Sequence, residues 1–113
     1  MTAARLNSAT FVSSLLRLAQ QEGGFAAVVK RGDESAGAVL IILAERGQPV
    51  DVLERLLTGD GRYAWASPLA APHNAADIDK FLEKRRRFDP DSWVIELDTA
   101  SAERFADEIR AID

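Results

Sequence analysis

The chain has 113 residues, of which 47% are hydrophobic and 28% are charged, and its formal net charge is −4. This length indicates one domain, and the composition is typical of a globular protein. The chain contains no cysteine and one histidine, His73. These counts exclude disulfides, thiolate nucleophiles and thiolate-bound or multi-histidine metal centres within one chain, so we expect neither a metal nor a cofactor.

The sequence shows neither a membrane-spanning segment nor a secretory signal. The longest apolar run, residues 38–44, is far shorter than the roughly 20 residues that span a membrane. The first residues show no charged start followed by an apolar stretch and a cleavage site, as a secretory signal would. We therefore expect a cytoplasmic protein with no membrane partner, which the lack of cysteine fits.

The first predicted element is a helix over residues 8–22, in which Phe11, Leu15 and Leu18 recur at i, i+4 and i+7. Asn7 or Ser8 is the expected N-cap.

A β-hairpin is predicted next, from residues 25–30 and 36–44. The turn at residues 31–35 contains Gly32, which is expected to supply a positive φ. The second of these strands is apolar on both faces, so we expect it at the centre of the sheet.

Residues 50–57 are ambiguous between helix and strand. Val50, Leu53 and Leu56 fit a helical face, whereas Pro49 before them and the turn-forming residues after them favour a strand. We predict a second hairpin of this segment with residues 62–67. Together the two hairpins would form an antiparallel meander of four strands.

The remaining elements are a helix over residues 75–88 capped by Asn74, a strand over residues 92–97, and a third helix capped by Asp98 or Thr99. Grouped strands flanked by helices indicate an α+β fold in a single domain, residues 1–113. The expected order is α-β-β-β-β-α-β-α. The expected architecture is a largely antiparallel or mixed five-stranded sheet with helices packed on one face.

Distinctive residue runs occur near both ends of the chain. Residues 24–33 read Gly-Phe-Ala-Ala-Val-Val-Lys-Arg-Gly-Asp and continue into Ala-Gly-Ala at 36–38, and residues 85–96 read Arg-Arg-Arg-Phe-Asp-Pro-Asp-Ser-Trp-Val-Ile-Glu. With these runs the chain resembles the bacterial domain of unknown function 1491 family, found largely in alphaproteobacteria. The resemblance implies the general layout of the fold and no activity, so it assigns no catalytic residue.

Tyr63 and Trp65 are the first candidates for a binding surface, because they share one face of a predicted strand. An exposed Tyr–Trp pair could stack a base or line the groove of a partner. Alternatively, the pair covers the sheet beneath a helix. Most other aromatic residues are expected in the core: Phe11, Phe25, Phe81, Phe105 and Trp93.

The second candidate is a basic cluster at the end of the helix over residues 75–88, formed by Lys84, Arg85, Arg86 and Arg87. It could bind phosphate groups of nucleic acid or nucleotides. The competing interpretation, a solvated face suited to the helix dipole, is favoured by the acidic net charge.

Arg31 and Asp33 form the third candidate, a charge pair that a polar loop could present to a ligand. The competing interpretation is a turn in which Asp33 bonds local backbone. His73 lies in a proline-rich linker with no assigned partner, and we expect it to be solvent-exposed and a poor catalyst.

The sequence therefore favours a non-enzymatic binding or adaptor module that acts through a face or an edge of its sheet. The partner would be another protein or a second copy of the chain. Nucleic-acid or nucleotide binding through the basic cluster and Tyr63 with Trp65 is the alternative. A small enzyme with carboxylate-based chemistry is a further alternative.

Overall fold

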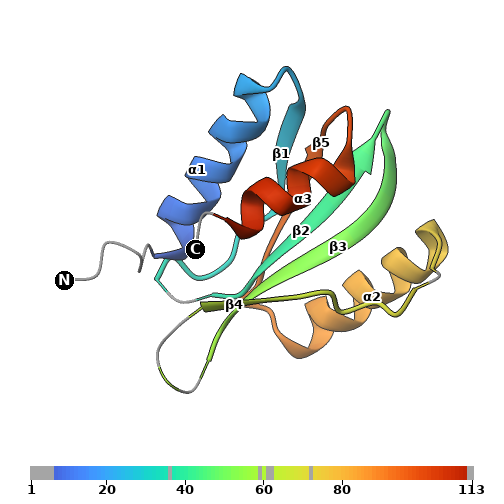
Figure 1. Cartoon of the computed structure of the whole chain (residues 1–113). Helices are drawn as coiled ribbons and strands as arrows, with labels where there is room; N and C mark the ends of the chain where they lie inside the picture. The colour runs from blue at the N-terminus through green and yellow to red at the C-terminus, as the bar shows by residue number, and fades with distance from the viewer. Residues whose placement is uncertain (1–6, 36, 59, 61–62, 72, 112–113) are drawn as a thin grey trace.

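The computed structural model describes residues 7–35, 37–58, 60, 63–71 and 73–111. These residues form helices α1 (Ser8–Gln21), α2 (Ala75–Phe88) and α3 (Ala102–Arg110), and strands β1 (Phe25–Lys30), β2 (Val39–Glu45), β3 (Gln48–Leu57), β4 (Tyr63–Ala66) and β5 (Trp93–Asp98) (Figure 1). The predicted α+β class and element order are confirmed. Residues 50–57 belong to β3, so the ambiguous segment is a strand.

The strands form one sheet in the order β1-β5-β2-β3-β4. β5 lies antiparallel to β1 and parallel to β2, and the β3–β4 pair is antiparallel as predicted. The predicted hairpin of residues 25–30 with 36–44, and the meander built on it, are wrong because β5 inserts between the two strands. Ile95 and Val94 are buried on opposite faces of β5, and a strand that is apolar on both faces favours an interior position.

Helices cover both faces of the sheet, so the expectation of one covered face is wrong. Ile41 and its alternate neighbours in β2 pack with α1 and α3, whereas Leu40 and Ile42 pack with Ile78 of α2. A strand that is apolar on both faces needs cover on both. Figure 1 shows α1 and α3 on one side of the sheet and α2 on the other.

The caps and turns follow local side-chain chemistry. Asn7 caps α1, and Asn74 caps α2 in a capping box with Asp77. The third cap is Ser101 rather than Asp98 or Thr99. Instead, the Asp98 carboxylate accepts hydrogen bonds from backbone N–H groups in the turn between β2 and β3.

No helix within the described residues is long and apolar enough to cross a membrane.

Candidate functional site

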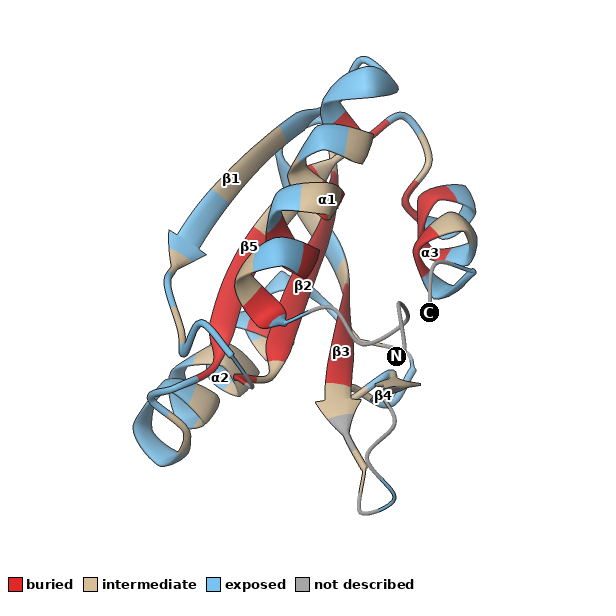
Figure 2. Cartoon of the chain, turned by 90° about the vertical axis from the view of Figure 1, so that its left-hand side faces the viewer, coloured by how far each residue is buried: buried red, intermediate tan, exposed pale blue. Residues whose placement is uncertain are grey.

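Strand β1 is an edge of the sheet and, among the residues whose burial the structure describes, carries most of the large apolar side chains that face solvent. Phe25, Val28 and Val29 are 65%, 38% and 59% exposed, and the strand is largely pale blue in Figure 2, where the interior strands are red. The expectation that Phe25 lies in the core is therefore wrong. An exposed edge strand with apolar side chains is the kind of surface that another extended segment can pair with.

A groove of about 620 Å³ lies between β1 and α2, with Val29, Leu82 and Val94 among its lining residues. Lys30, Asp79, Glu83 and Arg86 complete the lining. The groove thus combines an apolar surface with charged groups of both signs, and it borders the exposed edge strand directly.

The end of β1 is held by Lys30. Its Nζ donates to the backbone carbonyl oxygens of Pro90, of Ser92 at 3.1 Å, and of Arg31 at 3.3 Å. A register shift between Val28 and Lys30 interrupts the pairing with β5 just before this point. Such bulges bend and twist an edge strand, and here the bulge stands beside the groove.

Arg31 and Asp33 lie in a loop that packs on the segment before β5. The Arg31 guanidinium lies 5.0 Å from the centroid of the Trp93 ring. The Trp93 indole donates to the Asp33 carbonyl oxygen at 2.7 Å, and the Asp33 N–H donates to the Asp91 carbonyl oxygen at 2.9 Å. The Asp33 carboxylate also accepts from the N–H of Ser35, which confirms the predicted local turn.

Gly32 is not among the residues with positive φ, so its predicted conformational role is wrong. A Cβ at this position would stand 2.3 Å from the Asp91 carbonyl oxygen and 2.7 Å from Trp93 Cδ1. A Cβ added at Gly37 would also stand 2.3 Å from the Asp91 carbonyl oxygen. The two distinctive runs of the sequence therefore meet in space, and the glycines of the first run permit the close contact.

The basic cluster is divided among different environments. Arg85 forms an ion pair with the buried carboxylate of Glu54, and its guanidinium lies 5.2 Å from the Phe81 ring centroid. Arg87 pairs with Glu83 at 3.6 Å, and Arg86 lines the groove beside β1. The cluster is therefore not one uniform cationic surface.

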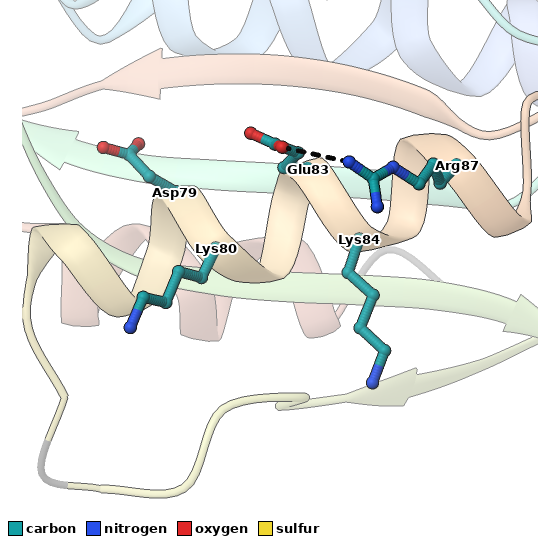
Figure 3. A pocket seen from close by; sticks show the side chains of 5 residues that line it. All are labelled: Asp79, Lys80, Glu83, Lys84 and Arg87. Atoms are coloured by element: carbon teal, nitrogen blue, oxygen red, sulfur yellow. Dashed lines mark ion pairs between the residues drawn. The ribbon is translucent and has the colours of Figure 1, made fainter.

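The outer face of α2 holds a shallow depression of about 320 Å³. Figure 3 shows Asp79 and Glu83 on one flank of the helix and Lys80 and Lys84 on the other, with Arg87 reaching back to Glu83. The acidic flank belongs to the groove beside β1, whereas the two lysines line a separate hollow next to the linker before α2.

Trp65 lies on the sheet face opposite α2. Its ring centroid is 5.8 Å from that of Phe11 in α1, and it packs against the core beneath α1 and α3. Tyr63 begins β4, but its side chain is outside the described part of the structure. Trp65 and the basic cluster therefore do not converge on one surface.

The expectation of an exposed, unpartnered His73 is wrong. Its ring is 12% exposed, and its Nε2 lies 3.3 Å from Asp51 Oδ1 and 3.1 Å from the Val50 carbonyl oxygen. The carboxylate of Asp77, in the first turn of α2, accepts from the N–H of Asn74 in the capping box. His73 thus ties the linker to β3. Within the described residues no three metal-ligating side chains come together.

Two buried charged residues escaped the sequence-based reasoning. Glu54 and Arg55 are 4% and 1% exposed and adjacent in β3, so they point to opposite faces of the sheet. Their adjacency between the apolar pairs at residues 52–53 and 56–57 was the available signal. The groove beside β1 had no such signal, because α2 and β1 are far apart in sequence.

Comparison with known proteins finds one matching family and several similar solved structures. A family described as "Protein of unknown function (DUF1491)" matches residues 6–107. A solution structure of a protein from A. tumefaciens is 34% identical, with a TM-score of 0.72 over 86% of this chain and 88% of that one. No curated protein matches.

Two structures of DUF1491 family proteins from Caulobacter crescentus CB15 are also similar. The crystal structure is 32% identical, with a TM-score of 0.73 over 88% of this chain and 94% of that one. The NMR structure is 32% identical, with a TM-score of 0.75 over 87% of this chain and 89% of that one.

Proposed function

Because this chain belongs to the DUF1491 family, as its sequence resemblance suggested, and that family name carries no activity, we propose a function from its own surface. The chain is a non-enzymatic binding module that adds an extended segment of a partner protein to the β1 edge of its sheet. A cytoplasmic location, which the lack of cysteine fits, is part of the proposal.

One observation carries this proposal: the edge strand β1 exposes Phe25, Val28 and Val29 together. The backbone groups along an edge strand can hydrogen-bond to an incoming chain. Proteins usually protect such an edge with charge, a proline or a covering segment. Here Lys30 and a bulge at Val28–Lys30 are the protective features of β1, and the apolar side chains of the strand stay accessible.

The opposite edge strand supports the same choice. β4 extends over four residues and packs Trp65 into the core. Short edge strands offer few backbone groups to a partner. β1, with six residues, is therefore the better edge for strand addition.

The proposal is tested with peptides selected from a random dodecapeptide library displayed on phage. We expect bound peptides to shift backbone amide resonances of residues 25–30 in an NMR titration of the full chain. Phe25→Lys, which places a charge on the edge without touching the core, should abolish binding. Shifts confined to another surface, or no selected binder, would rule the proposal out.

Nucleic-acid binding has weaker support from the geometry. Arg85 and Arg87 each face a carboxylate, Glu54 and Glu83 respectively, and Trp65 lies beneath α1 rather than beside α2. Phosphate binding would have to compete with these ion pairs. The edge of β1 is the better-supported site.

A further inference from the structure

We propose that the segment added to β1 carries an acidic residue two positions before an apolar residue, and that both side chains enter the groove between β1 and α2. This inference rests on the proposed function and specifies the chemistry of the partner. The occupant is an extended segment of a different polypeptide.

The apolar requirement comes from the lining of the groove. Val29 of the edge strand, Val94 of β5 and Leu82 of α2 all contribute to it. A strand paired to β1 would point alternate side chains toward the face that carries α2. An apolar side chain at one of those positions would cover Val29 and the neighbouring apolar lining of the groove.

The acidic requirement comes from charge at one end of the groove. Arg86 lies seven positions after Asp79 in α2, which is about 10 Å along the helix axis. Lys30 binds the carbonyl oxygens of Pro90 and Ser92, just past the end of α2. Lys30 and Arg86 therefore stand toward the same end of the groove, away from Asp79.

The ion pairs around Arg86 leave its guanidinium available to a carboxylate of the partner. Glu83 pairs with Arg87 at 3.6 Å, and neither Arg86 nor Asp79 makes an ion pair with another residue in the described ranges. A carboxylate of the partner would therefore meet the guanidinium of Arg86. The Lys30 ammonium, whose three donors go to backbone carbonyl oxygens, adds positive charge at the same end of the groove.

The direction of the partner follows from the direction of β1. β1 runs toward Lys30, so an antiparallel partner strand begins at the Lys30 end and runs away from it. Antiparallel pairing is slightly more stable per residue than parallel pairing. The acidic residue should thus precede the apolar one, with one residue between them that points to the other face.

A second copy of this chain fits the groove less well. Residues 25–30 read Phe-Ala-Ala-Val-Val-Lys and contain no acidic residue. A copy paired through β1 would bring another lysine and no carboxylate within the strand. Charge complementarity therefore favours a different polypeptide.

The test uses the phage library of the preceding section and two matched charge reversals in the full chain, Arg86→Glu and Lys84→Glu. Both substitutions change the same charge on the same helix, but Lys84 lies on the flank away from β1. We expect selected peptides to share the acidic–any–apolar pattern. Their affinity should fall roughly tenfold or more with Arg86→Glu and stay unchanged with Lys84→Glu.

Other outcomes separate this inference from the proposed function. Peptides that shift β1 amides but bind Arg86→Glu as tightly would overturn the inference and leave the edge-binding function standing. A dimer paired through β1 in solution, seen by sedimentation and by amide protection of residues 25–30, would also overturn it. The absence of any peptide binding at β1 would remove both.

Discussion

The guanidinium of Arg55 lies 3.8 Å from the centroid of the Phe11 ring, inside the core beneath α1. Arg55 is 1% exposed and faces Trp65 across the β3–β4 pair. A cation stacked on an aromatic ring and removed from water gains more than the same contact at the surface. This stack joins helix α1 to strand β3.

Arg55→Lys should destabilise the chain by about 2 kcal/mol, because lysine lacks the planar group that stacks on Phe11. Urea denaturation followed by tryptophan fluorescence measures the change. Arg86→Lys, a matched change on the surface, should stay within about 0.5 kcal/mol. Equal effects of the two substitutions would contradict the stacking role of Arg55.

Glu54→Ala should lower the free energy of unfolding by about 3 kcal/mol, because it removes the carboxylate that pairs with the Arg85 guanidinium beneath α2. The Glu54 and Arg85 side chains are 5% and 23% exposed, so solvent compensates little. The double variant with Arg85→Ala should recover part of the loss. A double-mutant cycle from denaturation curves checks this, and additive single effects would show that the pair is not coupled.

Gly32→Ala should destabilise the chain by about 3 kcal/mol, since the added Cβ meets the Asp91 carbonyl oxygen at 2.3 Å. The backbone of that segment must move to admit it. Gly47→Asn is the control, because Gly47 has φ 79° with no atom within 4 Å of an added Cβ. Asparagine tolerates that conformation, so the control should change stability by less than about 1 kcal/mol.

A contact between α1 and α3 should make stability depend on pH. Hydrogen bonding to Glu108 raises the pKa of Glu22 above its ordinary value of 4.5, with smaller contributions from desolvation and from the Glu108 charge, while Arg104 opposes the shift. The folded state thus holds the proton more tightly than the unfolded state. This contribution favours folding at low pH and is lost as pH rises from 4.5 through the folded-state value.

Glu22→Gln should therefore raise the melting temperature at pH 7, and the difference from the unmodified chain should shrink as pH falls toward 4.5. Thermal unfolding at a series of pH values measures it. Glu34→Gln, in an exposed loop, serves as the control. A constant difference across the pH series would show that Glu22 and Glu108 do not interact.

The chain should show no salt-dependent affinity for a single-stranded oligonucleotide. Its net charge is −4, and two of its clustered arginines face carboxylates, so few cations can displace counterions from a phosphate backbone. Fluorescence anisotropy of a labelled oligonucleotide at low salt tests this. Binding that disappears with Lys84→Glu would instead support a nucleic-acid function.

Short sequence patterns correctly predicted those elements that depend on residues a few positions apart. The helix over residues 75–88 and its Asn74 cap are predicted by side chains a few positions apart. The β3 segment needed its flanking turn residues, because its own pattern fitted two periodicities. Glu54 and Arg55, which spoil the apolar alternation, are buried because partners from α2 and α1 reach them.

By itself, the sequence determined the α+β class, the element order, the family and the absence of cysteine chemistry, because these depend on composition and short-range spacing. The tertiary structure alone decided that β5 separates β1 from β2, that α2 covers the second face, and that His73 meets Asp51. Which distant strands pair depends on the free energy of burying whole strands and whole sheet faces. That free energy cannot be read from any short segment of the chain. The edge of β1 and its groove exist only because of that choice.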